Sequence, residues 1–210
     1  MSDIFYKITR TVGKFVFWMN SRPIVRGTNN VPRTGPCLVV ATHQSPYDVP
    51  LLIRHTPRLL DFVSATDVFQ NPIVATLYRS LNAFPLDRSH ADPGTVRTII
   101  RKLKGGRAVA MFPEGGVRSE ADSVTTTRRM KPGLGRLANL ANAPVVPCVI
   151  INSSVYSRPT RWMPNKRTRY GVIFGTPIAP TLLAGDIHSN VIDAFVSLHT
   201  SLVAEMARQR

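Results

Sequence analysis

The chain has 210 residues and a mass of 23.2 kDa, and 43% of its residues are apolar. This length and composition predict one domain with a full hydrophobic core, and they exclude an intrinsically disordered chain and a small disulfide scaffold. The 27 basic residues outnumber the 12 acidic ones and give a formal charge of +15, which favours an anionic partner: nucleic acid, an anionic membrane surface or a phosphorylated small molecule.

The apolar runs are interrupted by Lys, Arg or Pro well before the roughly 18 residues that a spanning helix needs, so we predict no transmembrane span. The N-terminus lacks the pattern of a cleaved signal peptide, which predicts a chain that stays in the cytoplasm. Cys37 and Cys148 each lie inside an apolar run, where a free cysteine behaves as a small buried hydrophobe. This pattern suits a reducing compartment.

Residues 4–19 combine apolar side chains at helical spacing with cations on the opposite face, which predicts an amphipathic helix. The helix packs on the core with a solvated basic back, or it lies in a membrane interface with aromatic side chains at the headgroup level; both interpretations stay open. We expect residues 1–22 to form a membrane-associating helix and residues 23–210 to form a single domain. The apolar positions are Phe5, Ile8, Val12, Phe15, Val16 and Met19, the cations are Lys7, Arg10 and Lys14, and the interfacial aromatics are Phe15, Phe17 and Trp18.

Short β-type runs alternate with helical runs along the rest of the chain. This alternation predicts an α/β fold with a largely parallel central sheet flanked by helices, and the near-continuous apolar strands indicate a sheet covered on both faces. Residues 119–129 are predicted to form an exposed loop. The predicted strands are residues 37–41, 59–64, 108–112, 145–151 and 170–174, and the predicted helices are residues 46–55, 67–80, 94–104, 133–142 and 189–207.

His43 follows the first of these strands, in the kind of loop where open α/β sheets place their ligands. Ser45 is predicted to cap the next helix, with Pro46 at its first position and Asp48 three residues after the cap. The carboxylate of Asp48 either accepts a hydrogen bond from the His43 ring and fixes its tautomer, or only completes a capping box. Because no nucleophile elbow and no zinc-ligand spacing occur, His43 is predicted to act as a general base directly on a substrate.

Two later segments suit an anion. Arg88 follows an apolar-to-polar transition, and Glu114, Gly115 and Gly116 follow a predicted strand, with Arg118 shortly after them. Glycines let backbone N–H groups approach a ligand closely, and a guanidinium offers a fork of donors that matches a phosphate. Each arginine alone is more typical of an ordinary surface residue in so basic a chain, but the ordered set with His43 favours a phosphate site.

The ordered motifs resemble the four sequence blocks of the 1-acyl-sn-glycerol-3-phosphate (lysophosphatidate) acyltransferase family. The resemblance implies a glycerol-3-phosphate acyltransferase-like fold and transfer of an acyl chain from acyl-coenzyme A or acyl-carrier protein to a lysophospholipid, without a cofactor or metal. The motifs are His43-x4-Asp48, Phe84-Pro85-Leu86-Asp87-Arg88, Phe112-Pro113-Glu114-Gly115 with Arg118-Ser119, the hydrophobic Val145-Val146-Pro147-Cys148-Val149-Ile150, and a basic turn at Met130-Lys131-Pro132-Gly133.

By this resemblance, His43 and Asp48 are the catalytic residues and the other matched residues bind substrate. Members of the family commonly have one residue fewer between the acid and the arginine of the third block, and a glycine where this chain has Asn82. The same resemblance implies a peripheral enzyme at the cytoplasmic face of a membrane. The substrate-binding residues so implied are Arg88, Glu114, Gly115, Gly116, Arg118 and Lys131.

Alternatives remain open. The acceptor is 1-acyl-glycerol-3-phosphate, glycerol 3-phosphate, another lysophospholipid or a glycolipid. A non-catalytic protein that binds lipid surfaces would use the same basic faces. A nucleic-acid-binding protein would explain the charge, but no signature of a sequence-specific nucleic-acid-binding motif is present.

Overall fold

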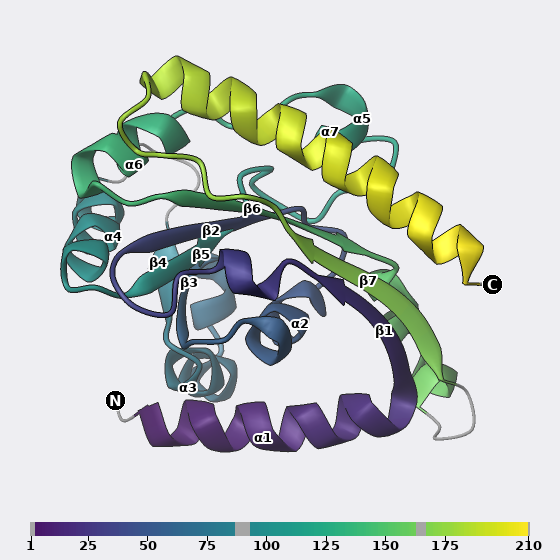
Figure 1. Cartoon of the computed structure of the whole chain (residues 1–210). Helices are drawn as coiled ribbons and strands as arrows, with labels where there is room; N and C mark the ends of the chain where they lie inside the picture. The colour runs from purple at the N-terminus through teal and green to yellow at the C-terminus, as the bar shows by residue number, and fades with distance from the viewer. Residues whose placement is uncertain (1–2, 87–92, 163–166, 210) are drawn as a thin grey trace.

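A computed structural model describes residues 3–86, 93–162 and 167–209 of the chain. These residues form one seven-stranded sheet in the order β1-β7-β6-β2-β5-β3-β4 (Figure 1). The strands are β1 (Ser21–Arg26), β2 (Cys37–Ala41), β3 (Leu60–Ala65), β4 (Ala83–Leu86), β5 (Ala108–Met111), β6 (Val145–Ile151) and β7 (Thr168–Phe174). The helices are α1 (Asp3–Asn20), α2 (Asp48–His55), α3 (Pro72–Ser80), α4 (Pro93–Lys104), α5 (Val124–Thr127), α6 (Leu134–Ala141) and α7 (Ala184–Arg208).

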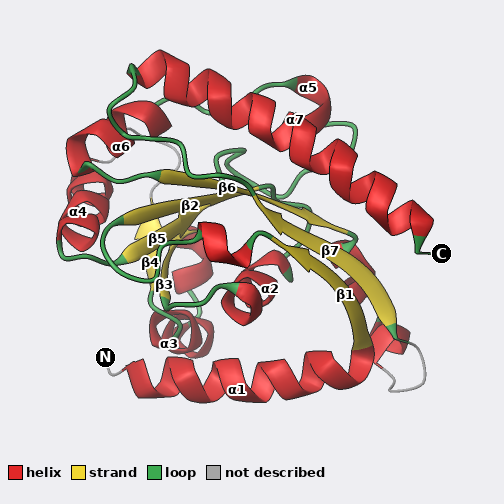
Figure 2. Ribbon diagram, viewed as in Figure 1, coloured by secondary structure: helices red, strands yellow, loops and turns green. Residues whose placement is uncertain are grey.

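The sheet is parallel except where β6 pairs with β7. Figure 2 shows α1, α2 and α3 along one face of it and α4, α6 and α7 along the other. The strand β2 is buried at every position, and its side chains alternate between two hydrophobic clusters: Val39 packs on the α1–α2 side, and Leu38 and Val40 pack on the α4–α7 side. The predicted α/β architecture is confirmed.

The five predicted strands are confirmed to within two residues at each end, whereas β1 and β4 were missed. Both lie at an edge of the sheet and contain a proline, Pro23 or Pro85, and neither has the long apolar run that identifies β6 in spite of its Pro147. The helix predicted at residues 67–80 is divided into a 3-10 turn at Thr66–Phe69 and α3, because the side chain of Asn71 accepts hydrogen bonds from the first backbone N–H groups of α3.

The segment predicted as an exposed loop, residues 119–129, contains the short helix α5. Ser123 caps this helix by accepting a hydrogen bond from the backbone of Thr125, and both Ser123 and Val124 are buried. The prediction of exposure was therefore wrong at these two positions. Both positions are buried because the hydroxyl of Ser123 and the backbone N–H of Val124 donate to the carboxylate of Glu114.

The side of α1 that packs on the protein is not the side that carries most of its large apolar residues. Tyr6 and Phe17 are buried, and the ring of Phe17 meets Tyr156 edge-on at 5.2 Å. The interfacial role expected for Phe17 is thus wrong, because this side chain faces the core. Six other apolar side chains of α1 are 45–65% exposed: Ile4, Phe5, Ile8, Val12, Phe15 and Trp18. We call them the exposed apolar face of α1.

Among the described helices, none has the length and apolarity needed to cross a membrane.

Candidate active site

The candidate site lies at the carboxyl ends of β2 and β5, which are parallel neighbours in the middle of the sheet. His43 lies two residues after β2, and the loop after β5 carries the second set of candidate residues. The backbone N–H of Arg118 donates to the carbonyl of His43 at 2.7 Å and joins the two loops. The topology therefore brings together segments that are more than 70 residues apart in the sequence, as the prediction of a crevice at this edge requires.

Asp48 fixes the ring of His43. Its Oδ2 lies 2.9 Å from Nδ1 of His43, and the same oxygen accepts from the backbone N–H groups of Gln44 at 2.7 Å and Ser45 at 2.9 Å. Since an ionised carboxylate only accepts hydrogen bonds, this contact sets the proton on Nδ1 and leaves Nε2 as the acceptor. The contact with the ring excludes the interpretation that Asp48 only completes a capping box, and the same buried carboxylate also satisfies the backbone of the loop.

The predicted start of the helix is wrong. The helix α2 begins at Asp48, not at Pro46, and Ser45 is not its cap. The hydroxyl of Ser45 instead donates to Ser153 at 3.0 Å and accepts from the backbone N–H of Tyr47. The helix starts later than predicted because the N–H groups of Gln44 and Ser45 point to the carboxylate of Asp48, which keeps this segment in a loop.

Phe112 supports the other side of the imidazole. The two rings are stacked, with centroids 4.0 Å apart and planes inclined by 15°. The hydrogen bond to Asp48 and this stacking together restrict both the position and the plane of the His43 ring. An imidazole held in this way loses little entropy when a ligand meets it.

Glu114 is buried and its carboxylate binds the backbone of the His43 loop. Its Oε2 accepts from the backbone N–H of His43 at 2.7 Å, and its Oε1 accepts from the hydroxyl of Ser123 at 2.9 Å and the backbone N–H of Val124 at 2.7 Å. These contacts explain why Ser123 and Val124 are buried. Glu114 thus connects three segments of the site through protein donors, and a direct contact of its carboxylate with substrate stays a prediction.

The backbone conformation of the loop favours glycine at position 115. Gly115 has a φ of +76°, and a Cβ at this position would lie 2.6 Å from Cε of Lys131. The backbone N–H of Lys131 donates to the carbonyl of Pro113 at 3.0 Å, so the basic turn packs directly on the loop. Gly116 lines the same pocket as His43. The loop thus brings the predicted residues Gly115, Gly116 and Lys131 together with the imidazole.

Arg118 borders a second hollow. The guanidinium donates from Nη2 to the carbonyl of Glu114 at 3.2 Å, and the residue lines a hollow of about 560 Å³ whose walls are mixed, with Gln44 and Glu120 on one side and apolar residues of α7 on the other. His43 lines a different, apolar pocket. The imidazole and this guanidinium therefore occupy adjoining hollows joined by the His43–Arg118 backbone bond, not one common cavity. Arg88 lies outside the described residues.

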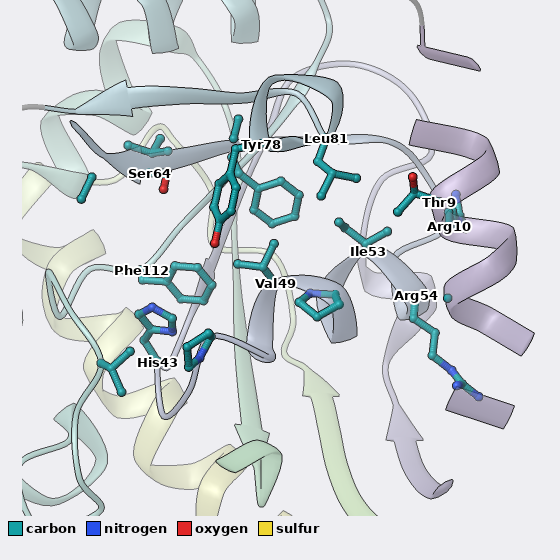
Figure 3. A pocket seen from close by; sticks show the side chains of 18 of the residues that line it. Thr9, Arg10, His43, Val49, Ile53, Arg54, Ser64, Tyr78, Leu81 and Phe112 are labelled. Carbon is teal, nitrogen blue, oxygen red and sulfur yellow. The ribbon is translucent and has the colours of Figure 1, made fainter. Parts of the chain in front are cut away.

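The apolar pocket has a volume of about 450 Å³ and extends from His43 to α1. Figure 3 shows His43 and Phe112 at one end and Arg10 and Arg54 at the other. Sequence reasoning missed its walls, since apolar side chains at helix and strand positions look the same whether they fill a core or line a cavity. Those walls include Val49, Ile53, Phe62, Tyr78 and Leu81.

Comparisons with known proteins agree with this site. A model of the acyltransferase family matches residues 22–151. A 1-acyl-sn-glycerol-3-phosphate acyltransferase of Bacillus subtilis is 27% identical over 143 residues, which is 68% of this chain and 69% of that protein. An uncharacterized protein of Mycobacterium tuberculosis is 32% identical over 158 residues, which is 70% of this chain and 42% of that protein.

The crystal structure of the 1-acyl-sn-glycerophosphate acyltransferase PlsC from Thermotoga maritima is similar to this chain with a TM-score of 0.74 and 25% sequence identity, over 95% of this chain and 80% of that one. The family model covers more than half of the chain and includes both loops of the site, with His43, Asp48, Glu114 and Arg118. The chain belongs to the acyltransferase family and is an O-acyltransferase.

Proposed function

We propose that this protein transfers an acyl chain from an acyl thioester to the free hydroxyl of 1-acyl-glycerol-3-phosphate, which forms phosphatidate. The observation that carries the proposal is the imidazole of His43, whose Nδ1 is held by buried Asp48 at the mouth of an apolar pocket of about 450 Å³. The names of the relatives from Bacillus subtilis and Thermotoga maritima support this acceptor.

In the proposed mechanism, Nε2 of His43 removes the proton of the acceptor hydroxyl as its oxygen attacks the thioester carbonyl. The tetrahedral intermediate then expels the thiolate, which takes the proton back from the imidazolium, so an ester and a free thiol leave the site. General base catalysis of this kind contributes about 10²- to 10⁴-fold, and the rest comes from positioning. No acyl-enzyme forms, because the hydroxyl attacks the thioester directly.

The apolar pocket suits the acyl chain. Its walls come from α2, α3, β3 and α1, and a chain lying along them would bring its carbonyl to the His43 end. Such a pocket excludes water from the reacting carbonyl, which protects the thioester from hydrolysis. The donor is acyl-coenzyme A or acyl-carrier protein, and the charge of +15 suits the phosphates of the former and the acidic surface of the latter.

The guanidinium of Arg118 in the adjoining hollow suits the phosphate of the acceptor. Arg118 lines this hollow, and its backbone N–H donates to the carbonyl of His43. A phosphate bound by Arg118 would therefore lie close to the imidazole. A guanidinium would also bind the phosphomonoester of glycerol 3-phosphate or the phosphodiester of another lysophospholipid.

The exposed apolar face of α1 supports a location at a membrane surface. Exposed apolar side chains that follow one another along a helix, with Lys7 and Lys14 beside them, are typical of a helix lying in the headgroup region. The lysophospholipid and its product both partition into that layer. The division of the chain at residues 22 and 23 and the cytoplasmic face of the membrane stay predictions.

Mass spectrometry of the products tests the proposal. The protein is incubated with 1-acyl-glycerol-3-phosphate, glycerol 3-phosphate, other lysophospholipids and a glycolipid acceptor, each with acyl-coenzyme A or acyl-carrier protein. We expect phosphatidate from the first acceptor at the highest rate. Faster acylation of another acceptor would replace the assignment of lysophosphatidate, and the absence of product with every pair would favour a protein that binds lipid surfaces without catalysis.

A further inference from the structure

A cluster of cations lies where α1 packs on α2, at the end of the apolar pocket opposite His43 (Figure 3). Arg10 and Arg54 line this end of the pocket. Lys14 and Arg54 line an adjoining groove that opens at the surface. We call Arg10, Lys14 and Arg54 the cationic cluster.

The positive charges of the cluster lie close enough to repel one another. Partial burial lowers the pKa of Lys14, and the positive charges of Arg10 and Arg54 lower it further. In the parts of the chain that the structure describes, no carboxylate oxygen lies within 4.0 Å of a nitrogen of these three side chains. The cluster therefore contains neighbouring positive charges without a counter-ion from the described residues.

Two of its buried donors also have no acceptor. Nη1 of Arg54 and Nε of Arg10 are shielded from solvent and have no hydrogen-bond partner. The remaining contacts hold these side chains in place: Nη2 of Arg10 donates to the carbonyl of Thr56 at 2.8 Å, and the guanidinium of Arg54 lies 5.7 Å from the centre of the Phe17 ring. These two nitrogens are closed to an outside ligand, so an anion reaches the cluster through the parts of the three side chains that line the pocket and the groove.

The neighbourhood of the cluster suits a lipid. Phe15 and Trp18, which belong to the exposed apolar face of α1, line the same groove as Lys14 and Arg54. A helix that buries this apolar face in a bilayer would hold the groove at the depth of the lipid phosphates. Tryptophan is the side chain most typical of that depth, because its ring is amphipathic.

We propose that the cationic cluster binds the phosphate of an anionic phospholipid headgroup in the membrane surface, with the acyl chains of this lipid against the exposed apolar face of α1. The site lies on the other side of the pocket from His43, so it is separate from the acceptor hollow lined by Arg118. The proposal rests on the membrane contact proposed for α1 and does not depend on the acyl-transfer chemistry.

Vesicle binding tests the site. Binding to phosphatidylcholine vesicles with and without phosphatidate is measured for the wild type, Arg54→Gln, Lys14→Gln and the matched control Lys7→Gln, which removes one charge from the same helix outside the cluster. Loss of one general surface charge weakens binding to anionic vesicles up to about fivefold. We expect this for Lys7→Gln and a loss of more than about tenfold for the two cluster variants. Equal effects of Lys7→Gln and Lys14→Gln would overturn the proposal.

A second measurement distinguishes a lipid headgroup from a free anion. The chain has two tryptophans, so in a Trp162→Phe background Trp18 reports alone from the groove. We expect saturable changes in its fluorescence with monomeric short-chain phosphatidate and much weaker binding of inorganic phosphate. Equal affinity for both would overturn the lipid assignment, as would unchanged short-chain phosphatidate binding by Lys14→Gln, an exposed position whose substitution leaves the fold intact.

The His43→Ala variant separates this proposal from the proposed function. It should bind phosphatidate vesicles as the wild type does, whether or not the protein acylates lysophosphatidate. A loss of vesicle binding in His43→Ala would contradict a headgroup site at the far end of the pocket.

Discussion

Replacing Glu114 by Gln tests how the site is held together. The carboxylate accepts from the backbone N–H of His43 with one oxygen, and from the hydroxyl of Ser123 and the backbone N–H of Val124 with the other. Glutamine has the same shape but only one accepting oxygen. If this oxygen keeps its two partners on the Ser123 side, the amide NH₂ faces the N–H of His43, and two donors meet in a buried place.

A buried donor without an acceptor costs about 1–3 kcal/mol. For a chain of this length that corresponds to a decrease in the melting temperature of about 3–9 °C. Because the lost contact holds the His43 loop, kcat should fall as well. Thermal unfolding and steady-state kinetics are measured beside Glu205→Gln, the same change at a carboxylate of α7 that pairs with Arg26 and lines neither hollow. A melting temperature and kcat equal to those of the control would refute the role of Glu114 in positioning His43.

Two further predictions concern the loop and the core. Gly115→Ala should lower the free energy of unfolding by more than Gly106→Ala, because both glycines have a φ near +75° but only the first meets a side chain, Lys131, at 2.6 Å. Denaturant unfolding of the two variants checks this, and equal losses would contradict the contact. Burial, and then the charge of Arg54, lowers the pKa of His55 to about 3 from the ordinary 6.5. Since the unfolded chain binds this proton below pH 6.5 and the folded chain does not, stability should be complete above that pH and fall as pH decreases toward 3, by up to about 1.4 kcal/mol per pH unit. His55→Gln should remove this part of the pH dependence of unfolding, and an unchanged slope would contradict it.

The fold was predictable where strands are buried on both faces. The runs at β2 and β5 are apolar without interruption, and the run at β6 is long enough that Pro147 does not conceal it; such runs have few alternatives to a covered strand. The edge strands β1 and β4 were not predictable from local pattern, because their pairing partners lie far away in the sequence and their prolines signal the opposite.

The face of α1 that contacts the core was also not predictable. The periodicity of its large apolar side chains identifies one stripe, and this stripe is exposed. The stripe that packs on the protein contains Tyr6, Gly13 and Phe17, and only Phe17 is a large, purely apolar residue. Amphipathicity indicates that a helix has two faces, but the partner of each face depends on the tertiary structure.

The candidate site was predictable in its parts but not in its arrangement. The spacing of His43 and Asp48 allowed their contact, because one short loop joins them, but it left a capping box as the alternative until the structure showed the contact. The position of Arg118 in a separate hollow depends on how two distant loops meet, and the role of Glu114 depends on donors that are remote from it in the sequence. Motifs predict which residues take part, whereas the shape of the cavity follows from packing.

The rate of acyl transfer by His43→Ala tests the central claim most directly. It is measured with lysophosphatidate and an acyl thioester beside the wild type and His188→Ala, which removes a histidine from α7 away from the site. If Nε2 of His43 takes the proton of the attacking hydroxyl, kcat falls about 10²- to 10⁴-fold in His43→Ala and stays at the wild-type value in His188→Ala. Turnover by a folded His43→Ala protein within a few-fold of the wild type would contradict this mechanism.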